Sequence, residues 1–340
     1  MNSKALPSAK HQAMSKVGAV MRQLPWAVSA MMAELIQFRF AYPLEFVEEA
    51  TTPGSLHYYL FSDKLFLDNL DCDEAGVAVR NYRVQGRQYN PVFIAWWALV
   101  NLERHLKHSD PQGLNNFHIQ VRWLMDNAVS RPDGAVVWPY EVDWQEGRCH
   151  LRSPWISAMS QGLAVSALVR AHRLTRNPAF LSLCERAVKV FEIKVEDGGV
   201  RTYEGPHVLY EEYPGYPLAR VLDGFLFSLL GLYDLAVELQ SLRIRQLFDE
   251  GVDGLKVKLA DWNYRSKWSW YGTHGYLCPP HYHRLNGTLL HILACLTGDE
   301  ALKRTSLQWR QEHLSVFDKS EIFLMFALTK NLARLRLPRN

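Results

Sequence analysis

Three similar helix-ending segments recur at a constant spacing along the chain. They are AHRLTRNPAFL, GLYDLAVELQSL and LACLTGDEALK, which align on Leu174, Leu235 and Leu296 at intervals of 235 − 174 = 61 and 296 − 235 = 61 residues. A repeat built from a helix, a short turn and a second helix is typical of stacked helical hairpins. A single hairpin cannot bury its apolar face alone, so neighbours must pack in an array or close into a ring. The spacing therefore predicts a mainly α protein, an α/α toroid that forms a complete or incomplete (α/α)6 barrel.

Apolar residues at helical spacing predict the individual helices. PVFIAWWALVNLERHL opens with Pro91, which suits the first turn of a helix. WISAMSQGLAVSALVRAHRL follows, and PAFLSLCERAVKVFEI comes after the turn at Asn177–Pro178. Another helix is expected to begin near Val221 and to bury one broad apolar face. That face consists of Val221, Leu222, Phe225, Leu226, Leu229, Leu232 and Tyr233.

The start of the chain differs from the rest. Residues 17–38 predict an amphipathic helix, residues 56–67 are strand-like, and residues 68–76 form an acidic turn. We therefore predict an N-terminal helix and short β segment over residues 1–80, packed on an α/α-toroid domain over residues 81–340.

Composition limits the class of protein. With 340 residues, 48% of them apolar and 21% charged, the chain can bury a large core. Its net charge of +3 is far from that of a dedicated nucleic-acid binder. The apolar N-terminal stretch is broken by Arg22 and Pro25 and ends at Glu34, so we expect no integral membrane segment. Five scattered cysteines without a CxxC pair favour a reducing compartment. We expect a cytoplasmic protein, with peripheral membrane contact as an alternative, and allow for a homodimer.

Three long insertions between the predicted hairpins, residues 132–154, 196–217 and 261–283, are rich in Trp and Tyr. Long loops on a rigid scaffold are where function usually resides. In a toroid these insertions would gather at one mouth and line a cleft. Aromatic rings offer an apolar face and a polar tip to flat, hydroxylated ligands. We expect this cleft to be mildly basic as well as aromatic, which fits an acidic polysaccharide or oligosaccharide as the substrate.

The second insertion contains YEEYP, in which Glu211 and Glu212 are flanked by Tyr210 and Tyr213. Acidic residues just before a helix can simply stabilise its N-terminus. On composition alone, that structural role and a role in a functional site both remain open.

Two long motifs resemble the C-terminal catalytic domain of the D-glucuronyl C5-epimerases, enzymes that convert glucuronate to iduronate in heparan-type chains. They are PWISAMSQGLAVSALVRAHRLT and LYEEYPGYPLARVLDGFLFSLLGLYDL. Weaker similarity extends through YNPVFIAWWALVNL, VVWPYEVDW, SWYGTHG and HYH, so the resemblance covers roughly residues 90–300. It implies an α/α toroid, in agreement with the repeat spacing.

The resemblance also implies a reaction and a site. Epimerisation at C5 removes the proton α to the uronate carboxylate and returns one to the opposite face, which requires a base, an acid and groups that stabilise the carboxylate. No cofactor or metal is required. The family's functional residues fall on Glu212, Tyr213, Tyr271 and Tyr282. We predict Glu212 and Tyr282 as the opposed acid–base pair, with Tyr213 and Tyr271 orienting the sugar or sharing in proton transfer.

Further residues are predicted to contact the substrate: Trp155, Gln161, Tyr210, Glu211, Arg220, His274, His283 and Arg284. The chain departs from the family pattern at several positions, including the RLNGTLL sequence that follows Tyr282–His283. His274 stands where the family usually has an arginine, and Asp223 replaces an asparagine. If that arginine binds the uronate carboxylate, His274 must replace it, or Arg220, Arg265 or Arg284 must be recruited.

Two other functions remain open. A uronate polysaccharide lyase forms the same C5 carbanion but expels the substituent at C4. A non-catalytic glycan-binding member of the family would keep the aromatic cleft alone. A hydrolase is disfavoured because Glu212 has no clear carboxylate partner in the sequence. His281 and His283 with Cys278 match no usual zinc spacing, and the acidic turn near Asp71 lacks the glycine placement of an EF-hand, so we predict no metal site.

Overall fold

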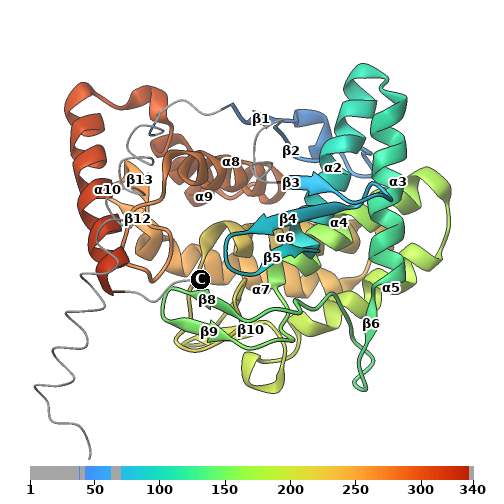
Figure 1. Ribbon diagram of the computed structural model, residues 1–340. Helices are drawn as coiled ribbons and strands as arrows, with labels where there is room; N and C mark the ends of the chain where they lie inside the picture. Colours follow the sequence, from blue (N-terminus) through green and yellow to red (C-terminus); the bar gives the residue numbers. More distant parts are fainter. Residues whose placement is uncertain (1–37, 39–42, 63–69, 337–340) are drawn as a thin grey trace, which may run out of the picture.

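The computed structural model describes residue 38, residues 43–62 and residues 70–336 (Figure 1). The helix predicted over residues 17–38 falls outside this part of the chain except for Phe38. The described helices are α2 (Pro91–His108), α3 (Pro111–Asp126), α4 (Ala158–Thr175), α5 (Ala179–Ala187), α6 (Leu222–Leu239), α7 (Leu242–Lys258), α8 (Pro280–Thr297), α9 (Glu300–Gln308) and α10 (Val316–Arg336).

The strands are short and pair locally. They are β1 (Glu45–Phe46), β2 (Leu60–Phe61), β3 (Leu70–Cys72), β4 (Ala78–Tyr82), β5 (Gly86–Gln88), β6 (Val129–Ser130), β7 (Val136–Val137), β8 (Trp144–Glu146), β9 (Cys149–Leu151), β10 (Arg201–Glu204), β11 (His207–Tyr210), β12 (Asn263–Tyr264) and β13 (Trp268–Ser269). Strands β3, β4 and β5 form one antiparallel sheet, and the other strands form two-stranded ladders. The predicted domain boundary after residue 80 lies inside β4.

The helices form hairpins that pack in an arc. In each of four hairpins of the described chain, an inner helix (α2, α4, α6 or α8) packs on the outer helix that follows it (α3, α5, α7 or α9). The inner helices contact one another in the order α2, α4, α6, α8. The fold is therefore the predicted mainly α toroid with β-hairpin insertions, in its incomplete form.

The repeat is less regular than the aligned leucines indicate. Each inner helix has 18 residues. Their first residues are separated by 158 − 91 = 67, 222 − 158 = 64 and 280 − 222 = 58 residues. The 61-residue spacing is the mean of the last two intervals, because the insertions differ in length while the helices do not.

The N-terminal segment spans the gap between the first and last inner helices. The side chain of Glu45 in β1 forms an ion pair with Lys107 near the end of α2. The ring of Phe46 lies edge-on to His291 of α8, with centroids 5.1 Å apart. The 3₁₀ turn Glu48–Thr51 packs on α8 as well. The arc of hairpins is thus completed by residues from before the first hairpin.

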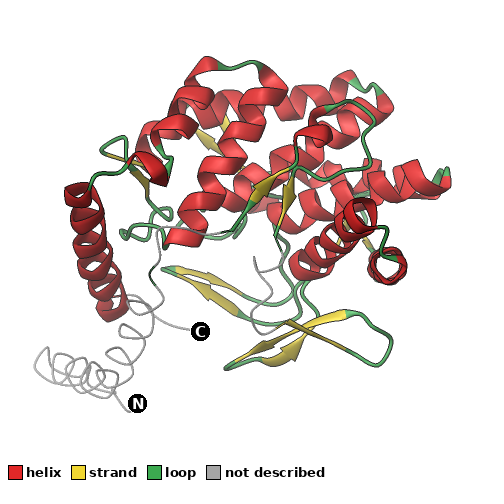
Figure 2. Ribbon diagram, turned by 90° about the horizontal axis from the view of Figure 1, so that it is seen from above, coloured by secondary structure: helices red, strands yellow, loops and turns green. Residues whose placement is uncertain are grey.

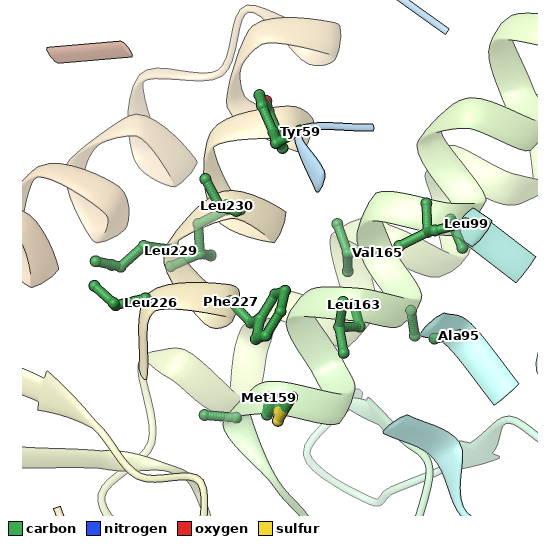
Figure 3. Close-up of a cluster of buried hydrophobic side chains, with 14 of the residues drawn as sticks. Tyr59, Ala95, Leu99, Met159, Leu163, Val165, Leu226, Phe227, Leu229 and Leu230 are labelled. Atoms are coloured by element: carbon green, nitrogen blue, oxygen red, sulfur yellow. The ribbon is translucent and has the colours of Figure 1, made fainter. Parts of the chain in front are cut away.

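Helices α4 and α6 form the closest helix pair of the described core. A Cβ atom on Gly162 of α4 would lie 2.6 Å from Ser228 Cα, and one on Gly231 of α6 would lie 2.3 Å from the Gly162 carbonyl oxygen. Both distances are too short for real carbon contacts, so glycine is required on each helix. Figure 3 shows the consequence for packing, with Phe227 of α6 directed toward Leu163 of α4.

Helix α6 is buried almost all round, although the sequence predicts only one apolar face. Its buried residues include Asp223, Ser228 and Asp234 as well as the predicted leucines. An inner helix has neighbours on several sides, here α4, α7 and α8. Even its polar side chains are therefore buried away from solvent.

The buried polar positions are satisfied by a network that joins three segments. Asp234 of α6 accepts hydrogen bonds from Arg170 Nη1, Ser166 Oγ and Tyr59 Oη, each at 2.7 Å. Arg170 also donates to the carbonyl oxygen of His57 from Nε and Nη2, at 3.1 and 2.8 Å. A buried ion pair is tolerated when further hydrogen bonds satisfy it. This network fixes the N-terminal segment to α4 and α6.

Substituting Gly162 by alanine should lower the free energy of unfolding by about 1–3 kcal/mol, because the added methyl group must separate α4 from α6. Gly287→Ala in α8 is the matched control: its Cβ would meet only Trp309 Cβ, at an ordinary 3.7 Å. That change should stabilise the helix by up to about 1 kcal/mol. Urea denaturation of both variants measures the difference. Equal effects of the two substitutions would contradict the close approach described for α4 and α6.

Candidate active site

A cavity of about 450 Å³ lies at the N-terminal ends of the inner helices. Residues from the first turn of every inner helix line it: Val92, Phe93, Met159, Asp223 and Tyr282. The inner helices run in one direction because each is separated from the next by an antiparallel outer helix. Their positive dipole ends therefore converge on this cavity.

The three aromatic insertions gather at the same end, as the sequence predicts. Each insertion connects an outer helix to the next inner helix, so each must emerge where the inner helices begin. Figure 2 shows strands projecting from one side of the helical body. The insertions, together with Trp155 directly after the first one, supply seven aromatic side chains to the cavity wall: Trp138, Tyr140, Trp144, Trp155, Tyr213, Tyr271 and Tyr282.

These aromatic side chains pack on one another and form a firm wall. The rings of Tyr140 and Trp155 stack with centroids 4.0 Å apart and planes 7° apart. Trp155 contacts Tyr213 at 5.9 Å, and Tyr271 meets Tyr282 edge-on at 5.5 Å. Such a wall suits the flat faces of sugar rings.

The adjacent carboxylates Glu211 and Glu212 have different environments. They follow strand β11, where successive side chains point to opposite sides. Glu211 turns away from the cavity, 2% exposed, and its Oε1 accepts from Arg220 Nη1 at 2.5 Å and Thr202 Oγ1 at 3.0 Å. Glu212 turns into the cavity. One carboxylate is thus neutralised in the wall, and its neighbour is presented to a ligand.

Glu212 does not precede α6 directly, since 222 − 212 = 10 residues separate it from the start of that helix. In space, however, it packs on the first turn of α6. A Cβ atom on Gly224 would lie 2.2 Å from Glu212 Oε2, so only glycine at this position admits the carboxyl group. The sequence alone shows neither the long connection nor this contact.

Burial raises the pKa of two carboxyl groups of the cavity, those of Glu212 and Asp223. Burial, followed by the nearby charges of Asp223 and Glu146, raises the pKa of Glu212 well above its usual range. Burial likewise raises the pKa of Asp223 to about 7. Glu212 Oε2 and Asp223 Oδ1 have no hydrogen-bond partner within the described protein. Both residues line the cavity, and the pKa of Asp223, about 7, suits proton transfer near neutral pH.

The tyrosines of the cavity are neutral. Burial raises the pKa of Tyr213, Tyr271 and Tyr282 well above the ordinary value, and neighbouring carboxylates raise each further. Arg80 opposes this shift at Tyr282. A neutral buried tyrosine can donate a proton, and a cation near it favours the tyrosinate that results.

All four residues predicted to be catalytic thus line one cavity, and Trp155 lies beside them. The other seven predicted substrate contacts lie outside the cavity. Three of them complete the protein core. Gln161 donates to the Val136 and Ala187 carbonyl oxygens, Tyr210 donates to that of Leu247, and His283 stacks on Trp268. Polar residues within a recognisable motif can serve the scaffold rather than the ligand.

The remaining four predicted contacts are held by other partners. Arg220 and Glu211 pair with each other, and Arg284 lies 3.1 Å from Glu312 at a different cavity. His274 Nε2 lies 2.8 Å from Glu146 Oε1. Glu146 lines the main cavity, whereas His274 lines a neighbouring one. His274 is therefore placed behind the cavity wall and not in it.

The structure adds cavity residues that the sequence did not predict as site residues. Asp223 and Glu146 contribute carboxyl groups, and strands β4 and β5 contribute Arg80, Tyr82 and Gln88. The replacement of the family's asparagine by Asp223 could have indicated that this residue belongs to the site. Arg80 offered no signal, because 271 − 80 = 191 residues separate it from Tyr271.

Neither a metal site nor a membrane span is found in the part of the chain that the structure describes. Over those residues, no group of three or more His, Cys, Asp or Glu side chains is arranged to hold a metal ion. Likewise, none of the described helices combines the length and apolar character that crossing a bilayer requires.

A cavity lined by aromatic rings and a few convergent polar groups with perturbed pKa values is the expected form of an active or ligand-binding site. Comparison with known proteins identifies the family. The sequence profile described as "D-glucuronyl C5-epimerase C-terminus" matches residues 132–311, which is 311 − 132 + 1 = 180 residues and more than half of the chain. The chain belongs to this family, as the sequence motifs imply, and family membership supports an epimerase-type enzyme.

Individual relatives agree with this assignment. A D-glucuronyl C5-epimerase of Caenorhabditis elegans is 34% identical over 228 residues, which cover 62% of this chain and 37% of the relative. The chain thus matches little more than a third of that enzyme. An uncharacterised protein of Methanocaldococcus jannaschii is 26% identical over 221 residues, 61% of this chain and 71% of the relative.

A solved structure, cellobiose 2-epimerase from Bacillus thermoamylovorans B4167, superposes with a TM-score of 0.40 and 12% identity. The superposition covers 64% of this chain and 57% of that one. A likeness at this level supports no conclusion about function.

The raised pKa of Asp223 predicts a pH-dependent stability. In the unfolded chain this carboxyl group ionises near its ordinary pKa of 3.8, whereas in the folded protein it keeps its proton up to about pH 7. The free energy of unfolding should therefore fall as the pH rises between these two values. Asp223→Asn should flatten this decline, as measured by urea denaturation across that pH range. Asp253→Asn, at an exposed carboxylate of α7, is the control. An unchanged pH dependence in the Asp223 variant would refute the prediction.

Proposed function

We propose that this domain catalyses the C5 epimerisation of D-glucuronate to L-iduronate residues in an acidic polysaccharide or its lipid-linked precursor. The observation that carries the proposal is the convergence of Glu212, Tyr213, Tyr271 and Tyr282 on one cavity. The family resemblance implies a functional role for each of them, although they come from two separate insertions and the start of α8.

The reaction requires two proton-transfer groups near one carbon atom. One group removes the C5 proton, and the electron pair of the broken C–H bond is delocalised into the adjacent carboxylate. A second group then delivers a proton to the opposite face of C5, which forms the new C–H bond. Protons and electrons balance without a redox cofactor.

Glu212 and Tyr282 are the proposed acid–base pair. Glu212 lies on the segment after β11 and Tyr282 on the first turn of α8, so the two approach the cavity from different elements. Burial gives the Glu212 carboxyl a raised pKa, which makes it a stronger base when ionised and still a usable acid when protonated. Tyr213 and Tyr271 would orient the sugar or share in proton transfer.

Solvent exchange tests the proposal directly. Glucuronate-containing chains, including heparosan and its N-sulfated form, are incubated with the protein in D₂O, and C5 deuteration is followed by NMR. We expect deuterium at C5 together with iduronate signals. Glu212→Gln and Tyr282→Phe should each slow exchange by roughly 10²–10⁴-fold, the usual contribution of a general acid or base. Tyr203→Phe, at an exposed tyrosine of β10, should leave the rate unchanged.

Other outcomes assign other functions. An unsaturated uronate detected by its ultraviolet absorbance, with chain cleavage, would identify a lyase that expels the C4 substituent from the same carbanion. Binding of the chains without exchange would identify a non-catalytic glycan-binding protein. Either result would exclude epimerisation as proposed here.

A further inference from the structure

The cavity is rich in acidic groups and contains little positive charge. Four carboxyl groups line it, those of Glu141, Glu146, Glu212 and Asp223. Among the described residues that line the cavity, Arg80 is the only one with a basic side chain. A uronate brings a further negative charge, and breaking its C5–H bond adds another. Such a ligand needs a cation at its carboxylate.

Arg80 is positioned by the first sheet. It lies in β4, the central strand, opposite Leu70 of β3 and Gln88 of β5. Gln120 of α3 fastens this strand by accepting from the Ala78 backbone N–H at 2.9 Å. Tyr82, at the end of β4, accepts from the side chain of Asn90, the N-cap residue of α2, at 2.5 Å. The sheet therefore holds Arg80 at a fixed place beside the first turn of α2.

The aromatic rings around Arg80 orient its guanidinium. The guanidinium carbon lies over the Phe93 ring, 4.1 Å from its centroid, and 6.0 Å from the centroid of Tyr82. Stacking on a ring uses the face of the guanidinium, and the N–H donors lie in its plane. An arginine guanidinium can form two parallel hydrogen bonds to a planar carboxylate.

Arg80 and the proposed acid–base residue Tyr282 line the same cavity. Its charge lowers the pKa of Tyr282 against the effect of burial. The other residues that the sequence offers as carboxylate ligands lie outside this cavity, each beside an acidic residue. Arg220 pairs with Glu211, Arg284 with Glu312, and His274 with Glu146. Arg265 is largely exposed and contacts Glu321 of α10 at 2.5 Å.

We propose that Arg80 binds the carboxylate of the sugar residue that is epimerised. This inference rests on the proposed function. The guanidinium would hold the uronate carboxylate in the ground state and stabilise the additional negative charge that the carboxylate receives when the C5–H bond breaks. The converging N-terminal ends of the inner helices add positive potential at the same place. Arg80, in the N-terminal sheet, would thus supply the positive charge that the third insertion lacks, because His274 stands there in place of the family's arginine.

Binding measurements test Arg80 without requiring catalysis. The titrated ligands are a heparosan oligosaccharide and the same oligosaccharide with its carboxyl groups reduced to alcohols. The unsubstituted protein should prefer the carboxylate form. Arg80→Gln should lose that preference and bind both forms alike, whereas Arg83→Gln, at an exposed arginine of the following turn, should keep it. Equal binding of both forms by the unsubstituted protein, or an unchanged preference in Arg80→Gln, would overturn the assignment.

Exchange kinetics separate this inference from the proposed function. In D₂O, Arg80→Gln should lower kcat/KM for C5 deuteration by about 10²–10³-fold through both kcat and KM, as expected when a charge-stabilising donor is removed. Arg80→Lys should recover part of the loss, because it keeps the charge but not the paired donors. Normal exchange by Arg80→Gln would reject the role of Arg80 and leave epimerisation intact. No exchange by the unsubstituted protein would reject epimerisation. The preference for the carboxylate oligosaccharide would then be the only test of whether Arg80 binds the carboxylate.

Discussion

The contact between α4 and α6 sets the geometry on which the rest of the domain depends. Gly162 and Gly231 let the two backbones approach more closely than side chains would allow. The Arg170–Asp234 pair then fixes the N-terminal segment to both helices. Because the inner helices start at the same end of the arc, this packing also decides how near their first turns lie to one another. The size of the cavity follows from helix packing and not from the loops alone.

The site combines buried acids with a scaffold whose helix ends favour negative charge. Glu211 is neutralised inside the wall by Arg220, whereas Glu212 lines the cavity, and its Oε2 has no hydrogen-bond partner among the described residues. Burial raises the pKa of Glu212 and Asp223, and the helix dipoles act in the opposite direction. Groups under such opposed influences can change protonation when a charged ligand enters. That property suits a reaction made only of proton transfers.

Much of the fold could be predicted from local pattern. Pro91 and the apolar period after it locate α2 within two residues, and the recurring leucines indicate hairpins of the correct mean length. The four residues placed in the site by resemblance do share a cavity. Two polar residues of the motifs that are predicted to contact the substrate, Gln161 and His283, lie outside the cavity. Gln161 and His283 satisfy buried backbone and ring contacts, because a densely packed inner helix needs polar partners as much as a site does.

The sequence by itself determined the helical hairpins, their approximate repeat, the aromatic insertions and the family, because these depend on neighbours along the chain. Only the tertiary structure decided which side chains face the cavity. It turned Glu212 inward and Glu211 outward, and placed Asp223 and Arg80 in the same cavity as Glu212 and Tyr282. These relations join residues far apart in the chain or depend on the direction of one strand. They arise when hairpins pack around a common axis, a step that leaves no local signal in the sequence.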